Sequence, residues 1–271
     1  MEELAELRSS GDPVLRRIPA ELKPKFNEIE SLKTALDAYN YGRAIDHHPI
    51  DQPLLAWLSQ TLMQTAKFFI PGASTPVKNF LESDQLYYLW SMVNTIHHNS
   101  NIEALEKEKS STSNAAVLNS KRKLSAVQEI EREKMDAMLK LPFVLKDMLT
   151  EIVNCRPSLL RKAHVIGYNV NGNSIRLIDA DLPDGHIIRL RRTDKLEYPM
   201  TNDDYVLKIL SLLELAAYGK VIIDDTYTLC CETRAPPRVG GGSSLVTPTF
   251  MPTNDNQDSS FSSSSKRAKK G

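Results

Sequence analysis

This sequence has little cysteine and no net charge. Its 271 residues include only three cysteines, Cys155, Cys230 and Cys231, and their spacing is not that of a zinc site. Lys plus Arg and Asp plus Glu number 34 each, so the formal net charge is zero. No global field therefore draws the chain toward nucleic acid or acidic lipid, and binding of either must come from local patches. The scarcity of cysteine predicts a reduced, intracellular protein.

Long uncharged apolar runs are also missing. The longest apolar region, 206–223, contains Lys208, Glu214 and Lys220. Each would cost roughly 2.5–3.5 kcal/mol near the centre of a membrane-spanning helix, so we expect no span and no membrane partner. The N-terminus is acidic and lacks the basic start and apolar run of a signal peptide. These features predict a soluble protein.

The sequence lacks the common catalytic and metal-binding motifs. It contains no Gly-x-Ser-x-Gly, no glycine-rich phosphate loop, no His-Glu-x-x-His and no Cys-x-x-Cys. Two adjacent histidine pairs are present, at 47–48 and 97–98. Neighbours on a helix point about 100° apart, so one pair makes a poor chelate, and surface or packed histidines are the favoured interpretation. We expect no metal and no cofactor, except Mg²⁺ under an alternative given below.

Apolar spacing predicts a mostly helical N-terminal half. One helix is expected over 28–41 and a second from Pro53 to Phe69, since proline suits the first turn of a helix. A third is expected from near Pro76 or Ser83, with one apolar face made by Leu86, Leu89, Trp90, Val93 and Ile96. Helical spacing returns over 126–154, where Pro142 should kink or divide the helix.

The region 164–218 predicts a compact α+β core. Alternating apolar residues over 164–171 end at Gly172, a second run covers 175–182, and a third lies at 187–190. The following stretch, 205–218, has helical spacing, whereas 221–231 fits a short strand or a helical continuation equally well. The predicted fold class is α+β: helical N-terminal half, three-stranded antiparallel meander with flanking helices, and disordered tail.

Composition divides the chain into four predicted regions. Residues 1–102 form a helical region, 103–125 a polar linker, 126–231 the α+β core, and 232–271 a serine-rich basic tail. Ordering each backbone unit costs roughly 1–2 kcal/mol, and the few large apolar side chains of the tail cannot offset that cost. We therefore expect the tail to be disordered.

Two carboxylates offer the best candidate for metal chemistry. Asp179 and Asp181 are two residues apart, so on a regular strand both project from the same face. Paired carboxylates at a strand end can hold Mg²⁺ for phosphodiester hydrolysis. Metal-dependent nucleases often follow with a second acid and a lysine on the next strand, but arginines stand there in this chain. A solvated strand face is therefore the default interpretation.

The arginines after the turn allow two interpretations. Arg189 and Arg191 share one face of the expected third strand and can pair with Asp179 or Asp181 across the hairpin. Together with Arg192 they are also candidates for binding the phosphates of nucleic acid. We favour the ion-pair interpretation.

The C-terminus carries one short signal. Lys266, Arg267, Lys269 and Lys270 form a basic cluster beside the serines at 259–260 and 262–265. Such a cluster in an accessible tail is a candidate nuclear-import signal, with an importin-type receptor as partner. Phosphorylation of the serines would add negative charge and weaken that binding. A solubilising basic end is the alternative.

Several segments resemble a known protein family. They are LPFVLKDML at 141–149, HVIGY at 164–168, IRLIDADLP at 175–183, GHIIRLRRT at 185–193, and Tyr-Pro at 198–199. Together they resemble an uncharacterised family of intracellular proteins from early-diverging, mucoralean-type fungi. The resemblance covers about residues 80–225 and implies a degraded, restriction-endonuclease-like (PD-(D/E)XK) domain. It implies no activity, because the family has no established biochemistry.

The chain departs from that family before the 141–149 segment. Family members tend to have a Gly-Arg-Lys-x-Asp segment and then an acidic, glycine-rich stretch. EKMDA at 133–137 matches the end of the first, so Asp136 can be carried over, but the acidic stretch is missing. If that stretch supplies metal ligands, this chain has lost them. A misassigned exon would leave the same gap.

The resemblance, the missing acids and the basic tail predict a catalytically inactive, nuclease-like protein with a nuclear interaction role. Its partner would be nucleic acid or a nuclear protein. One alternative is a magnesium-dependent nuclease that uses Asp179, Asp181 and Asp136. The other is a helical protein–protein interaction module with exposed leucines and Trp90 as its docking face.

Overall fold

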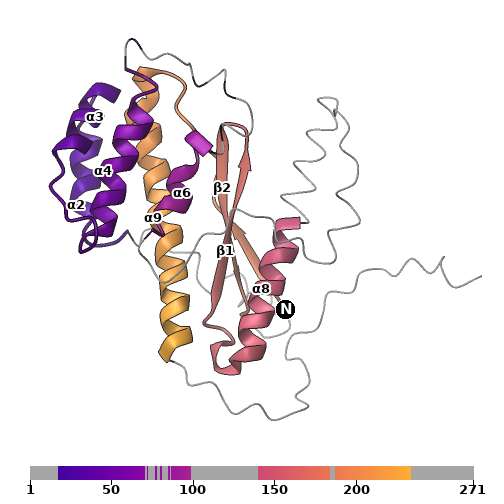
Figure 1. The fold of residues 1–271 in the computed structure, drawn as a ribbon. Coiled ribbons are helices and arrows are strands. Elements are labelled where there is room, and N and C mark those ends of the chain that lie inside the picture. Colours follow the sequence, from indigo (N-terminus) through magenta and orange to yellow (C-terminus); the bar gives the residue numbers. More distant parts are fainter. Residues whose placement is uncertain are drawn as a thin grey trace, which may run out of the picture.

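The fold was analysed in a computed structural model, which describes residues 18–70, 72, 77, 80, 85, 87–98, 140–183 and 187–232. Within these residues, six α-helices surround one four-stranded antiparallel sheet. One long helix lies against one face of the sheet with the N-terminal helices beyond it, and a shorter helix covers the other face (Figure 1). The predicted α+β class is confirmed.

The first helical region is a pair of helices. The structure has α2 at Lys23–Glu30 and α3 at Ala35–Ala44, so the single helix predicted over 28–41 is wrong. The physical reason is a capping box. The Thr34 hydroxyl accepts from the backbone N–H of Asp37 at 3.1 Å, and the Asp37 carboxylate accepts from the backbone N–H of Thr34 at 3.0 Å. These bonds satisfy the free donors of a helix start and begin α3 there.

Of the next two helices, one begins where the sequence predicts and the other is interrupted by a turn. Helix α4, Pro53–Ala66, begins at Pro53 as predicted. The predicted third helix is interrupted: residues 85, 87 and 88 are helical, Leu89 and Trp90 lie in a turn, and α6 follows at Ser91–Thr95. Leu86 lies outside the described residues. The Trp90 indole donates to the Gly172 carbonyl at 2.9 Å, which ties this turn to the sheet.

The predicted meander is confirmed and gains one strand. It consists of β1 at His164–Asn171, β2 at Ser174–Asp181 and β3 at Arg189–Arg192, in the order β1-β2-β3. Gly172 turns the first hairpin at a φ of 54°, a value that few other residues adopt readily. The unpredicted β4, Leu196–Glu197, pairs with the start of β2.

Two helices cover the sheet. Helix α9, Asn202–Glu232, is 31 residues long, so 221–231 continues the helix predicted at 205–218. Helix α8 is Leu141–Cys155, followed by a short 3₁₀ turn at Pro157–Leu159. Pro142 lies in the first turn of α8, where its missing N–H costs nothing, and Leu141–Cys155 is one helix. The residues expected to precede it, 126–139, lie outside the described part of the chain.

Strand alternation divides the core into two clusters. On what we call the α9 face, Ile175 and Leu177 pack with α9 and the N-terminal helices. On the α8 face, Ile178 and Ala180 pack with Leu145 of α8 and its neighbours. The N-terminal helices thus share one core with α9 and the sheet. The predicted linker at 103–125 and the tail after Glu232 lie outside the described residues, and none of the described helices is long and apolar enough to cross a bilayer.

Candidate functional site on the α9 face of the sheet

The two candidate carboxylates lie where their spacing predicts. Asp179 and Asp181 both project from the α9 face at the end of β2 and are 3% and 6% exposed. Register places Asp181 opposite His164 on one side and Arg189 on the other. In the same way, Asp179 lies opposite Ile166 and Arg191. A buried carboxylate must be paired or hydrogen-bonded, so its partners decide what it can do.

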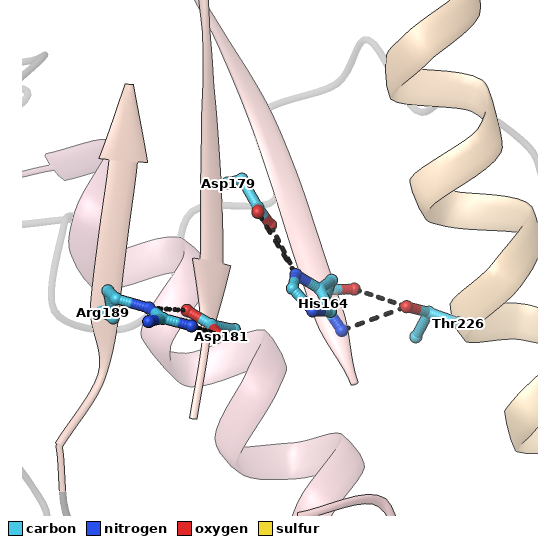
Figure 2. A network of polar contacts seen from close by, with 5 residues as sticks. All are labelled: His164, Asp179, Asp181, Arg189 and Thr226. Carbon is cyan, nitrogen blue, oxygen red and sulfur yellow. Dashed lines mark hydrogen bonds and ion pairs between the residues drawn. The ribbon is translucent and has the colours of Figure 1, made fainter. Parts of the chain in front are cut away.

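Asp181 is paired with Arg189 on the neighbouring strand. The Arg189 Nε donates to Asp181 Oδ1 at 2.9 Å, and Nη2 contacts Oδ2, which makes the contact two-pronged (Figure 2). The hydrogen bond from the guanidinium to this carboxylate raises the pKa of Arg189. Planar pairs of this kind are the strong form of an ion pair. The ion-pair interpretation is confirmed for Arg189 and Asp181.

Asp179 is paired with a residue that the sequence analysis did not select. His164 Nδ1 lies 3.0 Å from Asp179 Oδ1 and 3.2 Å from Oδ2 (Figure 2). The hydrogen bond that His164 donates to Asp179 raises the pKa of His164, although partial burial opposes that shift. The signal was present in the sequence. His164 begins the first strand and, once the hairpin register is known, it falls on the face of the two carboxylates.

The same histidine anchors α9 through its backbone. The His164 N–H donates to the Thr226 hydroxyl at 3.1 Å, and that hydroxyl donates to the His164 carbonyl at 2.9 Å. Because β1 is an edge strand, both groups would otherwise lack a partner in the sheet. Thr226 thus satisfies the first residue of the edge strand and fixes the C-terminal part of α9 against it, as Figure 2 shows.

This arrangement does not supply the open ligand set that a magnesium ion needs. Mg²⁺ takes oxygen ligands in octahedral geometry, and here the carboxylates face a guanidinium and an imidazole instead. Within the described residues, no group of three His, Cys, Asp or Glu side chains is placed to hold a metal ion. Asp136, the third candidate, lies outside the described residues. What the geometry shows is a buried network in which acids and bases neutralise each other.

The three candidate arginines do not form one patch. Arg189 and Arg191 lie on the α9 face, opposite Asp181 and Asp179. Arg192 lies opposite Ile178, on the α8 face, and is exposed. The alternation of the strand therefore separates a structural arginine, Arg189, from a solvent-facing one.

The histidine pairs have separate environments. His47 Nδ1 lies 2.9 Å from the Ile45 carbonyl, and His48 Nδ1 lies 2.9 Å from an Asp51 oxygen. His97 is buried, and that burial lowers its pKa, whereas His98 is exposed. The described part of the chain brings neither pair into a metal-binding group. The three cysteines are free thiols.

Comparison with known proteins gives no relative: the chain matches no protein-family model, no curated protein and no solved structure. The resemblance to the fungal family remains a prediction.

Proposed function

We propose that this protein acts by binding rather than by catalysis, as a nuclease-like domain without nuclease activity. The observation that supports the proposal is the engagement of both candidate carboxylates, Asp181 by Arg189 and Asp179 by His164. In a metal-dependent nuclease those oxygens would be free to bind the ion. Here they stabilise the junction of β1, β2, β3 and α9.

The cost of separating the buried charges also disfavours a bound cation. A cation entering this site would have to displace Arg189 and compete with His164, leaving a guanidinium that is only 18% exposed without its counter-ion. Breaking a buried ion pair by removing one partner costs about 3–5 kcal/mol, and metal binding would have to offset a cost of this kind. The network thus favours a stable, metal-free sheet.

The test is a cleavage and metal-binding assay on the full chain. Plasmid DNA, single-stranded DNA and RNA are incubated with the protein and Mg²⁺ or Mn²⁺, and metal binding is followed by calorimetry. We expect no cleavage and no saturable binding of either ion. Cleavage that needs the metal and is lost in Asp179→Asn but kept in Asp194→Asn would establish the nuclease alternative instead. Asp194 is the matched control because it is exposed and lies outside the network.

The proposed place of action is the nucleus. The support is the basic cluster Lys266, Arg267, Lys269 and Lys270, which lies outside the described residues. A fluorescent fusion of the full chain should accumulate in nuclei, and replacing all four residues by Gln should abolish that accumulation. A control that replaces Lys25, Lys33, Arg43 and Lys67, all in the helical half, should leave it intact. Equal distribution of all three fusions would contradict the import proposal.

The alternative function, a helical protein–protein interaction module, was predicted to use Trp90 in its docking face. Trp90 was expected in an exposed docking face, but its side chain is 3% exposed and packs edge-on against Tyr198 at 5.5 Å between ring centroids. That residue therefore belongs to the core. A binding role must use another surface.

A further inference from the structure

The described residues cover only part of the α8 face of the sheet. Helix α8 packs on Val165, Ile178 and Ala180, and the side chain of its first residue, Leu141, lies against Gly167. Beyond Gly167 the hairpin continues toward its tip, past the N-terminal end of α8 (Figure 1). Asn169 and Arg176 lie there, and Arg192 of β3 lies on the same face at the level of Gly167. We call these three residues the open basic face.

Register places the two arginines side by side. Asn169 lies directly opposite Arg176, and Arg192 lies opposite Ile178, two residues further along β2. Arg176 and Arg192 are therefore diagonal neighbours on adjacent strands and share a face. Diagonal neighbours are roughly 7–8 Å apart, within reach of a common ligand for side chains as long as arginine.

Neither arginine is neutralised. In the part of the chain that the structure describes, Arg189 is held by Asp181, whereas Arg176 and Arg192 make no side-chain hydrogen bond and no ion pair. Asp194, two residues after Arg192, is exposed and forms no ion pair in the described chain. Two like charges held close together on a rigid sheet repel each other, and a bound anion would relieve that repulsion.

We infer that the open basic face binds the phosphate backbone of nucleic acid. The inference rests on the binding role proposed above and gives its partner a chemical class. The guanidinium group presents paired N–H donors that match the oxygens of a phosphate, and the Asn169 amide adds a further donor on the neighbouring strand. Contacts of this kind position a protein on nucleic acid without reading its sequence.

The chemistry of the surface favours nucleic acid over an acidic peptide. Peptide binding draws most of its energy from apolar anchors placed in pockets, and the open basic face is made of amide and guanidinium side chains. Backbone binding draws its energy from the release of counter-ions, which needs only positive charge within reach of phosphates. Near the tip of the hairpin, the apolar side chains of Tyr168, Val170 and Ile175 are on the α9 face and pack with the core there.

The experiment measures binding of the full chain to a fluorescent single-stranded oligothymidine across a salt series. The test variant is Arg176→Gln with Arg192→Gln, and the matched control is Arg43→Gln with Lys67→Gln, which removes two exposed charges from the helical half. A third variant replaces the four basic residues of the tail by Gln. Urea unfolding of each variant confirms that it is folded.

We expect the test variant to bind about tenfold more weakly at low salt and the control to bind like the native chain. Each phosphate neutralised on a single strand contributes about 0.7 to the slope of log K against log salt, so the slope should fall by about 1.4. Equal binding by the native chain and the test variant would overturn the inference. So would binding lost only in the tail variant, or competition by polyglutamate as strong as that by unlabelled DNA. None of these results bears on nuclease activity, which the cleavage assay tests separately.

Discussion

The two faces of the sheet treat charge in opposite ways. On the α9 face, Asp179, Asp181, His164 and Arg189 are drawn into one network, and both carboxylates are buried. On the α8 face, Arg176 and Arg192 have no partners in the described chain. The charged residues of the two faces alternate along the same strands, β2 and β3, because successive side chains of a strand point to opposite faces. A charge under a helix must be neutralised to be tolerated, whereas a charge at an uncovered strand end is free to meet a ligand.

The largest expected effect comes from breaking the buried ion pair. Asp181→Asn should lower the free energy of unfolding by about 2–3 kcal/mol, because Arg189 would lose its counter-ion while remaining mostly covered. Urea unfolding measures the change. Asp194→Asn, an exposed acid on the neighbouring loop, should change it by less than about 0.5 kcal/mol.

Replacing both partners sharpens that result. The double variant Asp181→Leu with Arg189→Met should recover much of the loss, since apolar residues of similar volume often replace a buried ion pair without cost. A single variant as stable as the native chain would show that the pair contributes nothing.

The second prediction compares the glycines at which each helix approaches the sheet. A Cβ on Gly219 of α9 would lie 1.9 Å from the Tyr168 hydroxyl and 2.8 Å from Ile166 Cδ1. A Cβ on Gly167 of β1 would meet the Leu141 side chain of α8 at 2.6 Å, at its flexible end. We expect Gly219→Ala to cost about 1–3 kcal/mol and Gly167→Ala less than about 1 kcal/mol by urea unfolding. The reverse order would mean that α8 is held more tightly than α9.

The third prediction concerns two tyrosines of the core between α9 and the sheet, Tyr205 and Tyr168. Tyr205 shares a hydrogen bond of 2.7 Å with the Thr65 hydroxyl, so Tyr205→Phe should cost about 1 kcal/mol. The Tyr168 hydroxyl is buried and has no hydrogen-bond partner in the described chain, so Tyr168→Phe should leave stability unchanged or raise it slightly. Thermal unfolding of the two variants distinguishes them. A loss in Tyr168→Phe as large as in Tyr205→Phe would reveal a partner for that hydroxyl.

The smallest expected effect is on the pH dependence of stability. Asp179 holds the pKa of His164 above its unfolded value of about 6.5, so the stabilisation by this pair is complete below about pH 6.5. It is lost as the pH rises through the folded pKa. His164→Gln should therefore remove a stabilisation of less than about 1 kcal/mol that is seen near pH 6 and not at high pH. Urea unfolding across this range gives the profile.

His97 provides the opposite case in the helical region. Burial lowers its pKa, so its contribution is present above the unfolded value of about 6.5 and is lost as the pH falls below that value and through the lower folded pKa. The difference between native and His97→Gln profiles should have the opposite slope to the difference for His164→Gln. Equal slopes would contradict the assignment of the two environments.

The sequence predicted the elements that have a strong local signal. Alternation with period two and the turn at Gly172 gave the meander, and proline gave the start of α4. The helix predicted over 28–41 is two helices, because a capping box begins α3. Only four residues separate the two helices, so the apolar spacing is nearly continuous and does not reveal the break. Strand β4 has two residues, too few for a periodic signal.

The candidate site was predictable only in part. The spacing of Asp179 and Asp181 placed both carboxylates on one face, and the spacing of Arg189 made it a candidate partner. His164 and Thr226 were missed because they come from an edge strand and from a helix 62 residues further along the chain. Their role depends on register and on where α9 crosses the sheet, which local periodicity does not contain.

By itself, the sequence determined which residues share a face of each strand, because the side-chain period of a strand is fixed by backbone geometry. Only the tertiary structure decided which face is covered, by which helix, and up to which residue. That coverage sets the cost of a charge, since the same side chain is expensive to leave unpaired in the core and inexpensive at the surface. Asp181 is therefore a structural acid and Arg192 a candidate ligand for phosphate, although they come from neighbouring strands of one hairpin.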